Sequence, residues 1–448
     1  RHIAETGALP VLKVGDYPAA YLEEIKSKRF PPEMPVDAIA YEAHQPPLYY
    51  VLATPIYLGA RNGSNRSAAL ALRFFTLCLS TCALYAGYRA VRMALPGHVW
   101  LARGSLAMAA TLPMHIAMAA GINNDALAEL MINGAAWAAF ATSARAWRPR
   151  RAAVLGLLLG LAFLTKMQSY VAFALVLGAL LYDVAIGKLS KRQAASAGGL
   201  MLGVAGLVAM PWLVRNLAVY GPADLLALRR HDMVVKGQLT TASWLAQVTP
   251  AKAASSFLRT TFQSFWGQFG WMAAPLDQRL YAVLGLFVGL SLLGLAGIGR
   301  RLLRREICLG GALSRATAIM LVWVAVTALG YLWWNVRFVQ HQGRYLFPAL
   351  MPIALGLVLG WRALYREFWR AGLALIALAF LALLALGLLR GDLSVLGLGT
   401  LAAVGGGLLA SHFIERCRPG LPALFPGLGL VLLAVVALFD VVVPYLSP

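Results

Sequence analysis

Charged residues are scarce in this sequence. Only 13% of its 448 residues are Asp, Glu, Lys or Arg, whereas 60% are hydrophobic, and the mean hydropathy is +0.70. Soluble globular domains carry roughly 25% charged residues. The composition therefore excludes a soluble protein and indicates an integral membrane protein.

Cysteine is also rare, with four residues in the chain. So few cysteines exclude a disulfide framework. Cys78 and Cys82 stand one helical turn apart in an apolar run, so we expect them to be buried as small apolar side chains. Cys308 and Cys417 lie beside arginine clusters, which favours a cytoplasmic position where thiols stay reduced.

Acidic residues are outnumbered by basic ones, 18 to 39, which gives a formal charge of +21. Such an excess often indicates nucleic-acid binding, but here no basic groove accompanies it. The basic residues form short clusters between apolar runs, as the topology signals of membrane proteins do. We therefore expect a membrane lipid partner and no nucleic acid.

Apolar runs long enough to cross a bilayer, about 20 residues each, recur through the chain. They predict an all-α polytopic membrane protein with about 12 transmembrane helices. A further run at 48–60 is too short to cross and is typical of a helix lying at the membrane interface. The expected spans are 67–93, 99–119, 124–145, 152–166, 168–186, 197–220, 278–299, 313–334, 344–364, 371–389, 393–413 and 423–446.

These runs divide the chain into four parts. Residues 1–66 form an extracytoplasmic segment that ends in the interfacial helix, and residues 221–277 form a longer extracytoplasmic loop. The ranges 67–220 and 278–448 are transmembrane bundles of about six helices each.

Lysine and arginine clusters occupy alternate connections between the spans. Positive charge is enriched on the cytoplasmic side, so these connections are predicted to be cytoplasmic. The chain then begins and ends outside, and its composition favours a bacterial inner membrane. The clusters are Arg89 and Arg92, Arg145 to Arg151, Lys188 to Arg192, Arg300 to Arg305, Arg362 to Arg370, and Arg416 with Arg418.

The run 41–50 places polar groups directly before the interfacial helix. Pro46 and Pro47 disfavour helix in the preceding residues, so Glu42, His44 and Gln45 are expected in an extended approach. A helix can begin at Pro47, because proline at the first helical position loses no hydrogen bond. An ordinary junction between loop and helix is the alternative interpretation.

Other polar residues gather on the same predicted external side. Each has a simpler interpretation: Asp125 as a helix cap, Lys166 as a side chain that reaches for the interface, and Arg344 as an interfacial anchor. Taken together they predict a pocket for an anionic, lipid-linked substrate, because guanidinium matches phosphate with two parallel hydrogen bonds. The proposed substrate-binding residues are His44, Gln45, Lys166, Arg215, Arg337, Gln342, Arg344 and Tyr345.

Several short motifs resemble the C-type glycosyltransferase superfamily of polytopic membrane enzymes, nearest to its protein O-mannosyltransferase and lipid A aminoarabinose transferase branches. Their order and common external placement carry the resemblance across nearly the whole chain. The motifs are His44-Gln-Pro-Pro-Leu-Tyr-Tyr50, Arg73, Asn123-Asn-Asp-Ala-Leu127, Leu164-Thr-Lys166, Trp212-Leu-Val-Arg-Asn216 and Gly343-Arg-Tyr-Leu-Phe-Pro348.

The resemblance implies transfer of a sugar from a polyprenyl-phosphate carrier to a lipid, glycan or protein acceptor on the extracytoplasmic side. Fixed cations would stabilise the leaving phosphate, and a carboxylate would take the proton of the acceptor hydroxyl. Asp125 and Glu42 are the candidate catalytic carboxylates. Some family members use a divalent cation, for which Glu42, His44 and Asp125 are candidate ligands, although no metal-ligand pattern in the sequence assigns them.

One departure from the family concerns its catalytic aspartate. That residue lies in the first external loop, ahead of the segment that 1–10 resembles, and has no counterpart in this sequence. We expect the natural protein to carry one more span and an acid before Arg1. Two other classes stay open: a non-catalytic scaffold or accessory subunit of a larger membrane complex, and a transporter, for which paired internal repeats are lacking.

Overall fold

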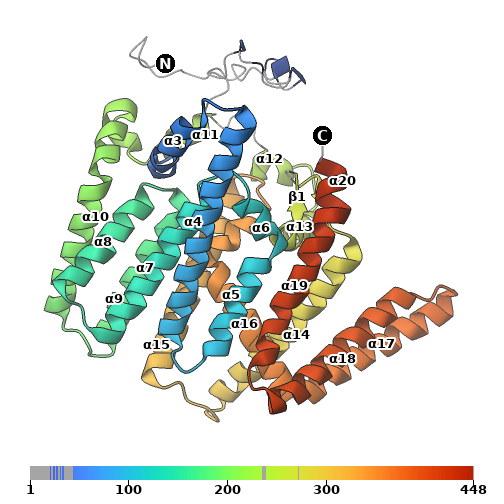
Figure 1. Ribbon diagram of the computed structural model, residues 1–448. Coiled ribbons are helices and arrows are strands. Elements are labelled where there is room, and N and C mark those ends of the chain that lie inside the picture. The colour runs from blue at the N-terminus through green and yellow to red at the C-terminus, as the bar shows by residue number, and fades with distance from the viewer. Residues whose placement is uncertain are drawn as a thin grey trace.

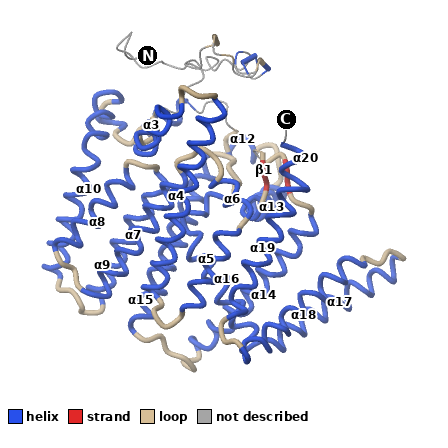
Figure 2. The backbone as a smooth tube through the Cα atoms, viewed as in Figure 1, coloured by secondary structure: helices blue, strands red, loops and turns tan. Residues whose placement is uncertain are grey.

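The computed structural model describes residues 21, 24–25, 27–28, 31, 33–34, 44–234, 239–270 and 272–446. Within these ranges the chain is a bundle of long helices that run roughly side by side, with short helices gathered at one end (Figure 1). The all-α polytopic class predicted from the sequence is confirmed. A two-residue antiparallel pairing of β1 (Gln268–Phe269) with β2 (Ala274–Pro275) is small beside the helices (Figure 2).

The first half of the bundle lies before the loop at 221–277. Its elements are α3 (Leu48–Ala60), α4 (Asn65–Ala94), α5 (Val99–Thr111), α6 (Pro113–Ala119), α7 (Asp125–Arg145), α8 (Pro149–Phe163), the 3₁₀ turn η2 (Met167–Tyr170), α9 (Val171–Ala185) and α10 (Lys191–Tyr220).

The loop and the second half complete the fold. The loop elements are η3 (Pro222–Asp224), α11 (Leu228–Val234), α12 (Thr241–Leu245) and α13 (Pro250–Trp266). After the β1–β2 pair come α14 (Gln278–Leu303), α15 (Gly311–Arg337), η4 (Gly343–Ala349), α16 (Leu350–Ala363), η5 (Leu364–Phe368), α17 (Trp369–Arg390), α18 (Val395–Cys417), η6 (Leu421–Leu424), α19 (Phe425–Val436), η7 (Ala437–Val442) and α20 (Val443–Leu446).

Eight helical stretches of the described chain are long and apolar enough to cross a membrane. One of them, Gly343–Arg390, holds both spans expected at 344–364 and 371–389, and η5 lies between its two parts. Three more expected spans form helices that are shorter or more polar, namely α5 with α6, α7, and α8. The chain is therefore an integral membrane protein.

The span expected at 99–119 is two helices rather than one. Leu112 has an extended backbone (φ −65°, ψ 119°), and Pro113 starts α6 in the first helical position. Proline clashes with the helical conformation of the residue before it, which explains the break. The change of direction places α6 across the end of the bundle, where it contacts α7, α13 and η4.

Cys78 and Cys82 are exposed on the outer face of α4, so the prediction that they are buried is wrong. The buried face of α4 instead carries Thr76, Ser80 and Ala83. In a membrane protein the apolar side chains of a helix can face lipid, and the contacts between helices favour small residues. An apolar run alone therefore does not tell which face is buried.

The segments at one end of the bundle, α3, α6, η2, η4, α12 and α13, are called the site end below. The start of α3 is fixed there by a hydrogen bond from the Leu48 N–H to the Leu164 carbonyl, 2.9 Å. Tyr49 joins α3 to α4 through Thr76, 2.8 Å between the hydroxyl oxygens. The α17–α18 pair extends away from the bundle at the opposite end (Figure 1).

Candidate functional site

Asp125 is held at the first turn of α7 by its neighbour Asn123. The Asn123 Oδ1 accepts from the Asp125 N–H at 3.0 Å, and its Nδ2 donates to the Met118 carbonyl at 2.7 Å. The Asp125 carboxylate does not cap the helix, so the prediction that Asp125 is a helix cap is wrong. The carboxylate forms an ion pair with Lys166, with both side chains about one quarter exposed (25% and 23%).

Lys166 reaches Asp125 from the short connection between α8 and η2. α8 ends at Phe163, and Lys166 has an extended backbone (φ −170°, ψ 150°) as the residue before η2. The buried Ser169 hydroxyl bonds to the carbonyls of Ala162 and Lys166, which fixes this turn. The lysine is therefore a paired group inside the protein and does not reach outward for the interface.

Arg344 enters the site from η4, which packs closely on α13. The Gly343 N–H donates to the buried Ser264 Oγ at 2.7 Å. A Cβ at Gly343 would lie 2.2 Å from the Thr261 carbonyl oxygen and 2.5 Å from the Phe265 nitrogen, so only glycine allows this approach. At the other end of η4, Trp323 donates to the Pro348 carbonyl.

The Arg344 guanidinium is only partly satisfied by the protein. Its Nη1 lies 3.4 Å from the Met118 sulfur, and its Cζ lies 5.5 Å from the centre of the Tyr345 ring. Its Nε is buried and has no hydrogen-bond partner within the described residues. A buried N–H of a charged group without an acceptor is costly, so this atom identifies a position where an acceptor would stabilise the protein.

Asp125 and Arg344 line a small pocket at the site end, and Lys166 contacts Asp125 without lining the pocket. Glu129 lies one helical turn after Asp125 on the same face of α7, so both acids reach this pocket. Gln168 from η2 and Phe347 from η4 close its sides. The lining residues are Met118, Asp125, Ala128, Glu129, Gln168, Arg344, Phe347 and Pro348.

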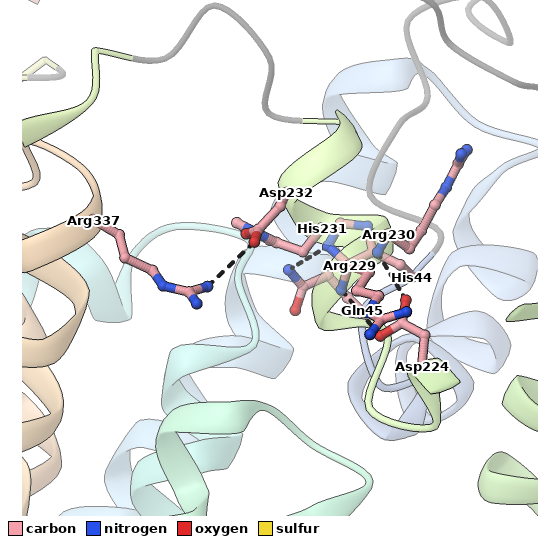
Figure 3. Close-up of polar contacts among 8 residues, drawn as sticks. All are labelled: His44, Gln45, Asp224, Arg229, Arg230, His231, Asp232 and Arg337. Atoms are coloured by element: carbon pink, nitrogen blue, oxygen red, sulfur yellow. Dashed lines mark hydrogen bonds and ion pairs between the residues drawn. The ribbon is translucent and has the colours of Figure 1, made fainter. Parts of the chain in front are cut away.

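Two further predicted cations lie away from this pocket. Arg337 forms an ion pair with Asp232 at 3.2 Å (Figure 3). Its guanidinium also lies over the Trp333 ring. Arg215 is sandwiched by Trp212 and Tyr220 and donates to Asn216. The structure thus brings Asp125, Lys166 and Arg344 together and leaves these two arginines outside the pocket lining.

The remaining predicted residues are close to the pocket in sequence or space but do not line it. His44 packs edge-on against His231 of α11, 5.2 Å between ring centres, with Gln45 beside it (Figure 3). Gln342 bonds to Gln340, and Tyr345 lies against Tyr331. Glu42 lies outside the described residues.

The connection before η4 is anchored by His341. Its ring packs against Trp244 and Phe257, at 5.1 Å between ring centres in both cases. Burial lowers the pKa of His341, because the charged imidazolium loses its hydration. The neutral ring thus joins α12 and α13 to the segment that carries Arg344.

Sequence reasoning missed Glu129, which the sequence pattern does not single out. For His115 the pattern favours a hydrogen-bonded packing residue, and the structure confirms a buried, hydrogen-bonded ring. The His115 Nε2 and the Glu129 Oε2 are 3.0 Å apart, and both side chains are buried. The spacing of four residues from Asp125 was a signal available in the sequence, because residues four apart share a helix face.

The described residues of the pocket do not form a divalent-cation site, and Glu42, one of the candidate ligands, lies outside the described residues. Within the described chain no group of three His, Cys, Asp or Glu side chains lies close enough to bind a metal ion. Asp125 is paired with a lysine, and His44 packs on another histidine. A hard cation requires several oxygen ligands, and the positive groups around Asp125 oppose it. The charges of the pocket therefore suit an anion better than a metal ion.

Fold and site together define an integral membrane protein with a cationic and acidic pocket at one end of its helix bundle. The chain belongs to the family described as predicted membrane protein DUF2142, whose model matches residues 36–353. No curated protein matches the sequence.

Among solved structures, the chain is similar to ArnT from Cupriavidus metallidurans in its apo state, with 15% identity over 96% of this chain and 72% of ArnT, at a TM-score of 0.47. The same enzyme bound to undecaprenyl phosphate matches at 15% identity, over 88% and 66%, at 0.48. The Archaeoglobus fulgidus oligosaccharyltransferase, in complex with Zn and sulfate, matches at 12% identity over 87% and 44%, at 0.47. The chain thus spans less than half of the archaeal enzyme.

Proposed function

We propose that this chain is a membrane glycosyltransferase of the C type, which moves a sugar from a polyprenyl-phosphate carrier to a lipid, glycan or protein acceptor. The observation that supports it most directly is the buried Arg344 Nε, which has no acceptor among the described residues, in a pocket that also contains acids. A phosphate oxygen is the acceptor that a guanidinium matches best.

The charges around the pocket fit a phosphate diester that leaves as a monoester. Arg344 supplies a fixed cation with a planar fork. Lys166 supplies a second, which Asp125 holds in place. As the bond from sugar to phosphate breaks, negative charge grows on the phosphate, and cations fixed in advance stabilise that charge.

The carrier's apolar tail has a surface beside the pocket. α3 exposes Val51, Ile56 and Leu58, at 61%, 37% and 46%. The hydrogen bond from Leu48 to Leu164 ties this helix to the turn that carries Lys166. An isoprenoid chain in the membrane can therefore lie along α3 with its phosphate at Arg344.

Replacing Arg344 by alanine should weaken binding of undecaprenyl phosphate by roughly ten- to hundredfold, since a hydrogen bond to a charged group contributes about 1.5–3 kcal/mol. Arg344→Lys should recover only part of the affinity, because an ammonium cannot replace the fork. Binding is measured with the purified protein by titration in detergent. Arg337→Ala is the matched control, because Arg337 is paired with Asp232 outside the pocket. Equal losses in Arg344→Ala and Arg337→Ala would refute a specific phosphate site.

The proposal also fixes the orientation: the site end faces the extracytoplasmic side of the inner membrane. In a protein that lacks Cys78, Cys82 and Cys417, a Gln247→Cys substitution on the loop at the site end should react with a membrane-impermeant maleimide on intact cells. The exposed native Cys308, at the opposite end, should react only after permeabilisation. The reverse pattern would place the pocket in the cytoplasm and exclude an extracytoplasmic acceptor.

A further inference from the structure

Glu129 and His115 form a buried pair in the wall of the pocket. Glu129 is 7% exposed and His115 3%, and their side-chain atoms are joined at 3.0 Å. The imidazole comes from α6 and the carboxylate from α7, so the pair exists only because the chain turns at Pro113. Carboxylates are rarely kept inside a membrane bundle without a function.

The two acids of the pocket, Glu129 and Asp125, have different partners. Asp125 is held by the fixed positive charge of Lys166, which stabilises its ionised form and makes it a weak proton acceptor. Glu129 is bonded to an imidazole, which can orient a carboxylate without holding a permanent charge against it. Among the described residues Glu129 forms no ion pair with a lysine or arginine, so its carboxylate is the one available to accept a proton.

The pair also faces the place where a substrate would lie. Glu129 lines the pocket together with Arg344 and Phe347. The His115 ring packs edge-on against Phe347, 5.6 Å between ring centres, so η4 holds the imidazole from one side while Glu129 holds it from the other. A proton acceptor and a phosphate-binding cation thus share one pocket.

We propose that Glu129 takes the proton from the acceptor hydroxyl during sugar transfer, and that His115 is the positioning residue that orients the Glu129 carboxylate. This inference rests on the proposed transferase function. The acceptor oxygen forms a bond to the anomeric carbon, and the bond from that carbon to the carrier phosphate breaks with its electron pair going to the phosphate. The hydroxyl proton passes to Glu129.

Replacing Glu129 by glutamine keeps the shape of the side chain and removes the base. Turnover should fall by about 10²- to 10⁴-fold, the range that a general base contributes, while the affinity for undecaprenyl phosphate stays within twofold. Turnover is measured as release of undecaprenyl phosphate from a panel of synthetic undecaprenyl-phosphate sugars, with membranes of the source cells as acceptor. Glu367→Gln, at an exposed ion pair with Arg301, is the control that should retain wild-type turnover.

His115 gives a second readout that a packing role would not change. The ionisable groups that line the pocket with Glu129 are Asp125 from α7 and Arg344 from η4. His115 from α6 contacts Glu129, and Lys166 contacts Asp125, but neither lines the pocket. An imidazole N–H that donates to the Glu129 carboxylate holds it in one orientation. His115→Phe should therefore lower kcat while the affinity for undecaprenyl phosphate stays within twofold, and His115→Gln, which keeps a donor, should largely restore kcat.

The outcomes separate this inference from the proposed function. Wild-type turnover in Glu129→Gln would overturn the proposal that Glu129 is the general base. Parallel losses of turnover, melting temperature and lipid affinity in that variant also overturn it, because they show a structural role. A wild-type protein that binds undecaprenyl phosphate and turns over none of the donors overturns it as well. Lack of Arg344-dependent binding of undecaprenyl phosphate refutes the proposed function itself.

Discussion

Placing a methyl group on Gly360 should destabilise the protein more than any other single-methyl substitution on α16. α14 and α16 cross with their backbones in contact at Gly294 and Gly360. A Cβ on Gly360 would lie 2.0 Å from the Ser291 carbonyl oxygen, and a Cβ on Gly294 would lie 1.9 Å from the Gly360 carbonyl oxygen. Small residues at helix crossings allow this approach in membrane proteins.

The colliding atoms belong to the backbone, so the strain cannot be relieved by rotating a side chain. Overpacking of this kind costs about 1–3 kcal/mol and occasionally more, out of a total stability of roughly 5–15 kcal/mol. The melting temperature of the detergent-solubilised protein should fall in Gly360→Ala and in Gly294→Ala. The double variant should lose less than the sum, because separating the helices once makes room for both methyl groups.

The chain supplies a matched control on each helix. Gly356 on α16 and Gly289 on α14 have no atom within 4 Å of an added Cβ. Gly356→Ala and Gly289→Ala should leave the melting temperature unchanged or raise it slightly, since alanine is the better helix former by up to about 1 kcal/mol. Equal melting temperatures for Gly360→Ala and Gly356→Ala would contradict the close crossing.

The sequence predicted helix starts well where residues next to the start determine it. Pro47 was expected to start the interfacial helix, and it is the N-cap of α3, which begins at Leu48. α7 starts at Asp125, one residue from the expected position. The break at Pro113 was visible as a proline, but hydropathy continues across it, so one span was predicted where there are two helices.

The site was predictable only in part. Asp125, Lys166 and Arg344 stand out in the sequence because each is an ionisable group next to an apolar run, and the structure brings them together. Arg337 stood out in the same way but faces Asp232. The direction in which a side chain points from its helix depends on packing against distant segments. A local sequence pattern does not contain that information.

The contacts of Asp183 are the clearest example of an interaction that the sequence could not reveal. This residue is fully buried on α9, at the opposite end of the bundle from the pocket. Its Oδ2 accepts from the Ser143 hydroxyl at 2.5 Å and from the Trp147 indole at 2.8 Å. Arg315 of α15 lies 3.6 Å from its Oδ1. One carboxylate therefore joins α7, α9 and α15.

Asp183→Ala should destabilise the protein by about 3–5 kcal/mol, because removing one partner of a buried ion pair leaves the other charge uncompensated. Asp183→Asn should cost less, since the amide oxygen can still accept from Ser143 and Trp147. Thermal unfolding of the detergent-solubilised protein measures the loss of stability in both variants. Asp392→Ala, in the exposed turn between α17 and α18, is the control and should have little effect.

A second substitution tests whether the unpaired Arg315 causes the loss of stability in Asp183→Ala. If the loss in Asp183→Ala comes from a buried guanidinium without its acid, the Asp183→Ala/Arg315→Ala double variant should be more stable than Asp183→Ala alone. A simple sum of the two single losses would refute the ion pair as the source of stability. The folded fraction of every variant should still bind undecaprenyl phosphate with wild-type affinity, because Arg344 and Lys166 lie at the other end of the bundle. Asp183 and Arg344 thus show two arrangements of a buried charge. Asp183 joins helices through Ser143, Trp147 and Arg315, whereas Arg344 lines a pocket that a ligand can occupy.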